Sequence, residues 1–372
     1  MSNSYLPPLS LIEKPTLLLD KQKVWRNISR MVEKANRAGV RLRPHFKTHQ
    51  SATIGSWFQA QGINDITVSS VDMAAYFAHH GWDDITLAFP VNWREIGKIN
   101  QLAATIRLNL LVESRETGHF LSQNLTQPVS VWLKVDTGYG RTGIHWTEKE
   151  QVIRVAESIA AASHLTLTGL LTHTGHAYGP TTPAQATALF QETVTRLQTL
   201  RSALHQPDLR LSIGDTPTCT LVEDLSGIDE IRPGNFVFYD YMQVQHGVCS
   251  PDDVAIALAC PVVARHPERQ EIVLYGGAIH LSKEYLDLPN GHKHYGAIAL
   301  PTSAGWSEPV PRAYVNRLSQ EHGIVQADPA FIEQVHIGDI LLVLPVHSCL
   351  TANLRQSYLT LEGETIPMAG IL

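Results

Sequence analysis

The sequence has few cysteines, little charge and no long apolar run. The four cysteines, Cys219, Cys249, Cys260 and Cys349, are scattered and form no C-x-x-C pair, which argues against a disulfide framework. No apolar stretch is long enough to span a bilayer, and no basic patch of the kind that binds nucleic acid is present. The opening residues lack the charged and apolar regions of a signal peptide, so we expect a cytoplasmic protein.

The length and composition are those of a globular protein with two domains. A chain of 372 residues exceeds the size at which single hydrophobic cores stop growing. Apolar residues make up 44% and charged residues 17% of the chain, which argues against long disordered segments. The net charge of -6 is modest and spread out, and no nucleic-acid partner is expected.

Strand-like and helix-like segments alternate over residues 16–245. Helices are expected at Ser51 to Gln61, Trp146 to Ala162 and Pro183 to His205. Eight strands alternating with helices predict a (β/α)₈ TIM barrel, with a doubly wound sheet as the alternative. The expected strands are Val40 to Phe46, Asp65 to Ser70, Asp84 to Pro90, Arg107 to Glu113, Pro128 to Asp136, Leu165 to His173, Arg210 to Asp215 and Ile231 to Tyr239.

Residues 246–372 follow a different pattern. Short strand-like runs with Gly, Pro and Asn between them, and little helical periodicity, predict a second, mostly β domain of sandwich or barrel type. Residues 1–15 could join either domain. The expected strands are Val254 to Val263, Gln270 to Tyr275, Asp339 to Leu344 and Ser357 to Leu361.

Lys47 stands where the first barrel strand is expected to end and a helix to begin. Such a lysine projects from the rim of an α/β sheet, where these folds build active sites. It could be a Schiff-base nucleophile, a phosphate clamp or a solvated surface amine. His45, His49 and Arg43 crowd the stretch with positive charge, and such neighbours lower the pKa of an amine and expose its lone pair.

Polar residues also follow the later barrel strands. Taken singly, Asp136, Asp215 and Asn235 are expected to cap helices or form turns. Gly214 with Thr216, and Gly234 with Asn235, place small residues at late strand ends where backbone N–H groups can approach a phosphate. A phosphate cradle together with a rim lysine suggests pyridoxal 5′-phosphate, and Arg141 or Arg232 could then lie near its ring.

His347 and Cys349 form the last candidate pair. At positions i and i+2 of an extended segment, both side chains would point to the same side and could reach one metal ion. A thiolate ligand favours zinc over magnesium or calcium, and the remaining ligands would be water or substrate oxygens. The alternative is a buried cysteine beside a hydrogen-bonded histidine.

Ordered motifs over nearly the whole chain resemble the D-threonine aldolase and D-serine dehydratase family, relatives of the alanine racemases with the fold-type III pyridoxal phosphate architecture. The motifs are Pro44 to His49, Val135 to Gly138 with Arg141 to Gly143, His173 to His176 with Tyr178, Gly214 to Thr218, Arg232 to Asn235 with Tyr239 and Asp240, Gly276 and Gly277, and His347 to Cys349.

The resemblance implies a role for each candidate residue. Lys47 would be the Schiff-base residue, and His347 with Cys349 would bind the divalent metal, expected to be Zn²⁺. The substrate would be a D-3-hydroxy amino acid, and a homodimer is expected. The other implied residues are Thr216, Gly234 and Asn235 for the phosphate, and Tyr178 and His173 for the substrate side.

The reaction implied first is β-elimination of water to an oxo acid and ammonia. The dehydratase branch of the family has His-x-Cys where the aldolase branch has a carboxylate in place of the cysteine, and Cys349 therefore favours the dehydratase. The alternatives are retro-aldol cleavage to glycine and an aldehyde, amino acid racemisation, a non-catalytic pyridoxal phosphate carrier, and a metal hydrolase on an ordinary barrel.

Overall fold

The computed structural model describes residues 7–179 and 182–370, which form two compact units. Residues 29–47 and 54–236 make up the first unit, and residues 7–28, 48–53 and 237–370 make up the second. The helices α1 (Lys21–Ala38) and α2 (Ala52–Gln59) contribute residues to both. Lys47 therefore belongs to the first unit and Thr48 to the second.

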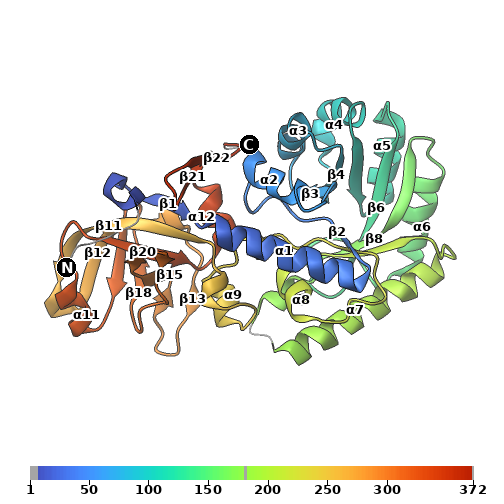
Figure 1. Cartoon of the computed structure of the whole chain (residues 1–372). Helices are drawn as coiled ribbons and strands as arrows, with labels where there is room; N and C mark the ends of the chain where they lie inside the picture. The colour runs from blue at the N-terminus through green and yellow to red at the C-terminus, as the bar shows by residue number, and fades with distance from the viewer. Residues whose placement is uncertain (1–6, 180–181, 371–372) are drawn as a thin grey trace. The chain divides into compact units, whose positions relative to one another are not determined.

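The first unit is a closed barrel of eight parallel strands (Figure 1). The strands pair in the order β2-β10-β9-β8-β6-β5-β4-β3, and a parallel pairing of His45 with Thr67 joins the two ends of this order. The predicted (β/α)₈ barrel is confirmed. The strands are β2 (Arg41–Leu42), β3 (Ile66–Val68), β4 (Asp84–Pro90), β5 (Arg107–Val112), β6 (Val129–Asp136), β8 (Leu165–Thr172), β9 (Arg210–Ile213) and β10 (Glu230–Ile231); β7 (Ile144–His145) pairs with β6 alone.

Helices follow most of the barrel strands, as the alternation predicts. The last strand is shorter than the expected Ile231 to Tyr239, because Pro233 has no N–H for a strand ladder and the 3₁₀ turn η4 (Asn235–Val237) follows it. The helices after β3 to β9 are α3 (Val71–His79), α4 (Ile96–Ala103), α5 (Arg115–Asn124), α6 (Lys149–Ala160), α7 (Pro183–Ala203) and α8 (Thr216–Leu221).

A buried ion network lies among the barrel strands. The guanidinium of Arg43, 2% exposed, is 2.8 Å from the Glu230 carboxylate, 2.7 Å from Asp84 and 3.0 Å from Asp65. Burial by itself would lower the pKa of Arg43, but the carboxylates more than offset it and raise that pKa. Arg43 is therefore charged and already paired.

The second unit contains a closed antiparallel barrel. β11 (Ile256–His266) pairs with both β12 (Glu271–Tyr275) and β20 (Ile340–Pro345), and so closes the ring β12-β19-β18-β15-β20-β11. A barrel is thus the observed form of the predicted β domain. The other ring strands are β15 (Gly296–Ala299), β18 (Tyr314–Leu318) and β19 (His322–Gln326). Short hairpins pair β13 (Leu286–Asp287) with β14 (Lys293–His294) and β16 (Pro301–Thr302) with β17 (Gly305–Trp306).

The N-terminal strand β1 (Thr16–Leu19) belongs to this second sheet. It pairs antiparallel with β11 and parallel with β21 (Ser357–Thr360), which in turn pairs with β22 (Thr365–Pro367). The compact units therefore differ from the expected boundaries of 16–245 and 246–372, because hydrogen bonding takes the segment from residue 16 to β11. Of the segments 1–15 and 246–372, residues 1–6 and 371–372 lie outside the described residues.

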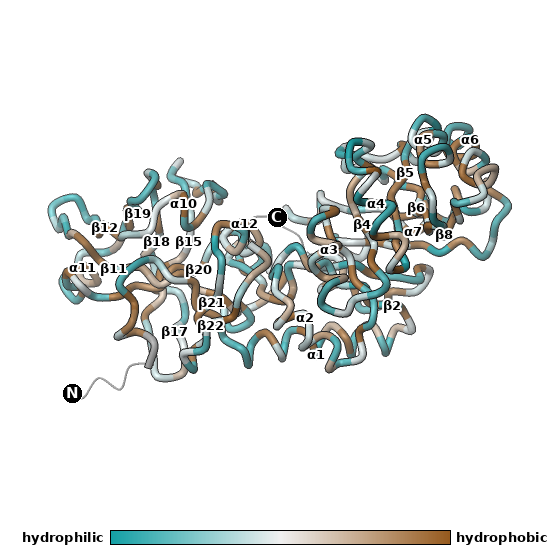
Figure 2. The backbone as a smooth tube through the Cα atoms, turned by 90° about the horizontal axis from the view of Figure 1, so that it is seen from above, coloured by the Kyte–Doolittle hydropathy of each residue, from teal (hydrophilic) through white to brown (hydrophobic). Residues whose placement is uncertain are grey.

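Hydrophobic residues gather along the strands of both units, as the colouring of Figure 2 shows. Leu110, Val131 and Leu170 in the parallel barrel and Leu258, Val343 and Ile298 in the antiparallel one have no exposed surface. Within the part of the chain that the structure describes, every helix is too short or too polar to cross a membrane.

Candidate active site

Lys47 lies just beyond the point where the barrel closes. Its neighbour Phe46 donates a backbone hydrogen bond of 2.8 Å to the Thr67 carbonyl, and Lys47 itself is exposed. Arg43, which the sequence analysis counts among the positive charges around Lys47, is charged, but its guanidinium is paired with three carboxylates. Arg43 therefore adds no unpaired positive charge beside the Lys47 amine.

Other cations do gather around this edge. Burial lowers the pKa of His45 well below its usual value, and the charges of Lys47 and Arg232 lower it further. Burial also lowers the pKa of His173 to about 3, with the charges of Arg141 and Lys47 adding to the effect. His45 therefore lies within electrostatic range of Lys47, Arg141, His173 and Arg232. The two histidines stay neutral, so the positive charge comes from the lysine and the arginines.

His173 and Tyr178 point at the loops after the late strands. The ring Nδ1 of His173 forms a short hydrogen bond with the Gly214 carbonyl, and because a carbonyl only accepts, Nδ1 carries the proton. The Tyr178 hydroxyl accepts a 3.2 Å hydrogen bond from the Thr216 backbone N–H. Both predicted substrate-side residues thus contact the segment predicted to hold a phosphate.

The segment from Gly214 to Thr216 connects β9 to α8. The Asp215 carboxylate caps α8 by accepting a 2.6 Å hydrogen bond from the Thr218 N–H, as the expected capping role predicts. The Asp136 carboxylate likewise accepts from the Gly138 and Gly140 N–H groups. Thr216 is fully buried, and its hydroxyl has no hydrogen-bond partner among the described residues.

Arg232 is fixed beside this segment. Its guanidinium donates to the Ser212 hydroxyl at 2.7 Å and to the Thr172 carbonyl at 2.5 Å. A Cβ built on Gly214 would lie 2.9 Å from Arg232 Nη1, so only glycine lets the chain and the guanidinium approach this closely. Gly234 and Asn235 are buried in the turn that follows Arg232. All the residues predicted to bind the cofactor belong to the first unit, namely Lys47, Arg141, Gly214, Thr216, Gly234 and Asn235.

Tyr139 is a residue of this edge that the sequence reasoning missed. It is 41% exposed, its ring lies 5.6 Å from the His173 ring, and the Arg141 guanidinium lies over it at 5.5 Å. A Cβ on Gly175 would come within 2.3 Å of the Tyr139 ring. The signal that could have found it is an aromatic residue between two glycines, Gly138 and Gly140, directly after a strand.

His347 and Cys349 lie in the second unit, where β20 passes into α12 (Ser348–Asn353). The expected extended segment is wrong, because the helix begins at Ser348 and puts Cys349 in its first turn. The two side chains still lie near each other, because the Cys349 sulfur raises the pKa of His347. Burial would lower the pKa of His347, but this sulfur and the charges of Asp240 and Glu284 raise it to about 9.

Two further contacts hold this pair. Asp240 accepts a 3.1 Å hydrogen bond from the Ser348 N–H, which anchors the start of α12, and the Thr48 hydroxyl lies 3.2 Å from the Cys349 sulfur. Among residues 7–179 and 182–370, no group of three or more His, Cys, Asp or Glu side chains could hold a metal ion. The chain therefore offers a pair of N and S donors, the types that zinc prefers, with other coordination positions left for water or substrate.

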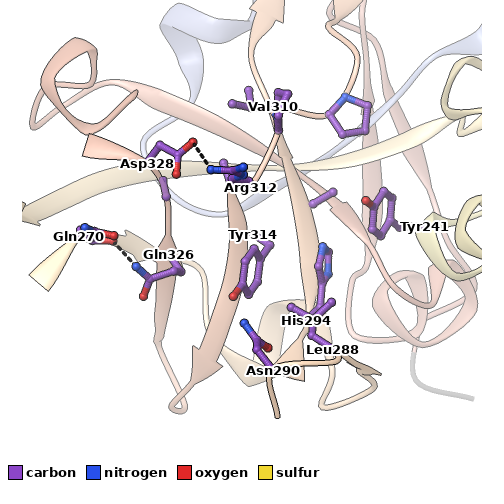
Figure 3. A pocket seen from close by; sticks show the side chains of 15 residues that line it. Tyr241, Gln270, Leu288, Asn290, His294, Val310, Arg312, Tyr314, Gln326 and Asp328 are labelled. Carbon is purple, nitrogen blue, oxygen red and sulfur yellow. Dashed lines mark hydrogen bonds and ion pairs between the residues drawn. The ribbon is translucent and has the colours of Figure 1, made fainter. Parts of the chain in front are cut away.

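A separate cavity of about 460 Å³ lies in the second unit and contains none of the predicted site residues (Figure 3). On its wall the His294 ring is stacked between Tyr241 and Tyr314, with centroid distances of 4.8 and 5.0 Å. Arg312 and Asp328 pair at 3.8 Å. Lys47 and the other residues predicted to bind the cofactor lie elsewhere, in the first unit.

Two family descriptions match the chain in succession. Residues 19–242 match "Alanine racemase, N-terminal domain", and residues 255–361 match "Putative serine dehydratase domain". The first match covers the strands of the parallel barrel together with Lys47, and the second covers most of the antiparallel barrel together with His347 and Cys349.

Curated relatives extend over nearly the full length of the chain. D-threo-3-hydroxyaspartate dehydratase of Delftia sp. (strain HT23) is 27% identical over 96% of each chain, and D-serine dehydratase of Dictyostelium discoideum is 28% identical over 95% of this chain and 94% of its own. D-threonine aldolase of Arthrobacter sp. is 22% identical over 96% of this chain and 92% of its own. The relatives thus include both dehydratases and an aldolase.

Several solved structures have the same fold as this chain. A histidine-to-alanine variant of a D-threo-3-hydroxyaspartate dehydratase has a TM-score of 0.89 at 26% identity, over 97% of this chain and 96% of its own. A cysteine-to-alanine variant of the same enzyme, in a metal-free form, has a TM-score of 0.88 at 26% identity, over 97% and 99%. Alanine racemase of Clostridium difficile shares the fold at 11% identity, with a TM-score of 0.67 over 96% of this chain and 99% of its own.

Proposed function

Because this chain belongs to the family that joins an alanine racemase N-terminal domain to a serine dehydratase domain, we propose that it is a pyridoxal phosphate- and metal-dependent lyase. Its reaction is β-elimination of water from a D-3-hydroxy amino acid, which yields an oxo acid and ammonia. The observation that carries this choice of reaction is that His347 and Cys349 lie near each other at the start of α12, a histidine and a cysteine in place of a histidine and a carboxylate. We also expect a homodimer.

The first unit fits pyridoxal 5′-phosphate. The buried Thr216 hydroxyl lacks a partner among the described residues, as a donor reserved for a phosphate oxygen would. Gly214, Gly234 and Asn235 would complete the phosphate site, and Lys47 would hold the cofactor covalently. Arg141 or Arg232 would lie near the ring, and two hydrogen bonds hold Arg232 in place. When bound, this cofactor supplies the electron sink that makes the α-proton of an amino acid removable.

The donor set of the second unit fits a divalent metal, expected to be Zn²⁺, held by His347 and Cys349. Such a metal supplies Lewis acidity toward a substrate hydroxyl. In the histidine and cysteine variants of D-threo-3-hydroxyaspartate dehydratase, the replaced residues are two positions apart in sequence, the same spacing as His347 and Cys349. This agreement supports the metal assignment.

The side chains of the barrel edge then have distinct tasks. Lys47 would remove the α-proton of the substrate from one face. Exposed Arg141 adds positive charge beside Lys47, which attracts the substrate carboxylate. His173 donates through Nδ1 to Gly214, so its Nε2 presents a lone pair that can accept a hydrogen bond. Tyr178 holds the Thr216 backbone in place beside it.

The aldolase is the second candidate, because a D-threonine aldolase is among the full-length relatives. The same residues would serve it, and the difference lies in which proton leaves. Removal of the α-proton leads to loss of water, whereas removal of the β-hydroxyl proton breaks the Cα–Cβ bond and gives glycine and an aldehyde. Product identity therefore separates the two reactions.

The test combines absorbance with product analysis. The purified protein is expected to be yellow and to convert D-serine, D-threonine or D-3-hydroxyaspartate to an oxo acid, with the rate falling when a chelator is present. Lys47→Ala should lose the visible absorbance, whereas Lys98→Ala, which removes a surface lysine paired with Asp72, should keep it. His347→Ala should keep the absorbance and lose the oxo acid.

Two results would count against the proposal. Aldehyde and glycine in place of oxo acid would assign the aldolase reaction. A colourless protein, or a Lys47→Ala variant with unchanged absorbance, would overturn the role given to Lys47.

A further inference from the structure

The hydroxyl of Thr48 is aimed at the sulfur of Cys349. The Oγ1–Sγ distance is 3.2 Å, within the range for a hydrogen bond to sulfur, although 301 positions separate the two residues. Thr48 has no exposed surface, so water does not compete for its hydroxyl. Thr48 also follows Lys47 directly in the chain.

The segment of residues 48–53, which carries Thr48, forms several hydrogen bonds to other parts of the second unit. Gln50 Nε2 donates to Asn353 Oδ1 at 2.9 Å, at the end of α12, and Gln50 in turn accepts through its carbonyl from the Ala369 N–H at 2.7 Å. The Ser51 hydroxyl donates to the Pro367 carbonyl at 2.8 Å. These bonds hold the Thr48 hydroxyl in place, so little side-chain freedom is lost when it bonds the sulfur.

The direction of this hydrogen bond follows from the chemistry of the sulfur. A cysteine that binds a metal does so as a thiolate, which has no proton and can only accept. In the metal-bound protein Thr48 must therefore be the donor. A fixed donor orients the thiolate and takes up a lone pair that the metal does not use.

We propose that Thr48 is a positioning residue of the metal centre, whose hydroxyl holds the Cys349 thiolate in the orientation that binds the metal. The proposal rests on the proposed function, because it takes Cys349 as a metal ligand. In this proposal Thr48 positions a metal ligand, although its neighbour Lys47 is the candidate cofactor lysine.

The expected effect is on metal affinity. Removing a hydrogen-bond partner of a metal ligand typically weakens metal binding about 10- to 100-fold. Thr48→Val keeps the shape of the side chain and removes the hydroxyl, and Thr48→Ala removes it with a smaller side chain. Thr48→Ser keeps the hydroxyl and should bind metal almost as the parent protein does.

The experiment uses Co²⁺ as the probe metal with the full-length, cofactor-loaded protein after chelator treatment. Titration gives the affinity, and the sulfur-to-cobalt charge-transfer absorption reports the Cys349 bond without any assay of activity. We expect Thr48→Val and Thr48→Ala to weaken Co²⁺ binding about 10- to 100-fold and to shift the charge-transfer band. Visible cofactor absorbance should stay at the parent level in all variants.

Thr351→Val is the matched control. Thr351 is also fully buried, lies in α12, and donates from its hydroxyl to the Leu281 carbonyl at 3.0 Å and not to the sulfur. Its loss should lower the melting temperature and leave the Co²⁺ affinity and the band unchanged. Equal Co²⁺ affinity and an unshifted band in Thr48→Val would overturn the proposal.

Cys349→Ser separates this inference from the function on which it rests. If the parent protein shows the charge-transfer band and Cys349→Ser lacks it, the thiolate is a ligand and the Thr48 variants alone decide the inference. If the parent protein shows no such band and Cys349→Ser binds Co²⁺ equally well, the metal role of Cys349 is wrong and the role of Thr48 is overturned with it.

Discussion

His294 is a buried histidine with aromatic rings on both faces. It is 7% exposed, stacks on Tyr241 and Tyr314, and has its pKa lowered to about 4 by burial. An unfolded chain protonates this ring as the pH falls below about 6.5, whereas the folded protein does so only near pH 4. The unfolded state therefore gains stability relative to the folded state in this window.

The difference in the His294 pKa between the folded and unfolded states predicts that this residue makes stability depend on pH. Between pH 6.5 and 4, His294 should cost the folded protein up to about 3 kcal/mol of unfolding free energy. His294→Phe keeps a ring in the stack and cannot titrate, so its unfolding free energy, measured by urea denaturation, should fall less steeply with acid. His119→Gln, at an exposed position of α5, should keep the parent slope. Identical slopes for His294→Phe and the parent protein would contradict the prediction.

Gly169 lets β8 pass close to its neighbours in the parallel barrel. A Cβ at this position would lie 2.1 Å from the Arg210 carbonyl oxygen and 2.6 Å from the Trp132 ring. The carbonyl is backbone of the adjacent strand β9 and the Trp132 side chain is fully buried, so neither group can move aside. The pairing of β8 with β9 therefore requires glycine here.

Gly169→Ala should consequently lower the free energy of unfolding by about 1–3 kcal/mol, the usual cost of overpacking. Gly97→Ala is the opposite case, because a Cβ at this position of α4 meets nothing within 4 Å and alanine is the better helix former. It should stabilise the protein by about 0.5–1 kcal/mol. Thermal unfolding of both variants checks the pair, and a Gly169→Ala protein as stable as the parent would show that β8 is displaced easily.

At the scale of the whole molecule, β1 gives the second unit three of its most buried side chains. Leu17, Leu18 and Leu19 are at most 1% exposed, and β1 lies between β11 and β21 in the sheet. Burying a leucine contributes about 1.5–3 kcal/mol, so the three together approach the 5–15 kcal/mol that stabilises a typical domain.

A fragment of residues 246–372 should therefore not fold by itself, although these residues were expected to form a domain. It should show no cooperative thermal transition by circular dichroism. The same fragment fused through a flexible linker to residues 7–28, which restores β1, should regain stability. Cooperative unfolding of the unfused fragment would mean that the closed ring of strands is stable without β1.

The sequence by itself determined the order of the elements and the place of the candidate chemistry. Apolar runs such as Val129 to Asp136, separated by helix-length segments, indicate buried strands because they depend on local preference and burial. Eight such runs in succession indicate the parallel barrel. Lys47, Gly214 and Thr216 could be found because each follows a strand directly, and the fold brings the carboxyl ends of parallel strands to one edge.

Only the tertiary structure decided which distant segments meet. The pairing of β1 with β11, the three carboxylates around Arg43 and the bond from Thr48 to Cys349 all join residues far apart in the chain. No local pattern specifies such partners, because a strand or a hydroxyl can pair with many others and the closing of the two barrels selects one. The start of α12 at Ser348 was likewise set by its anchor on Asp240, which the residues around His347 do not contain.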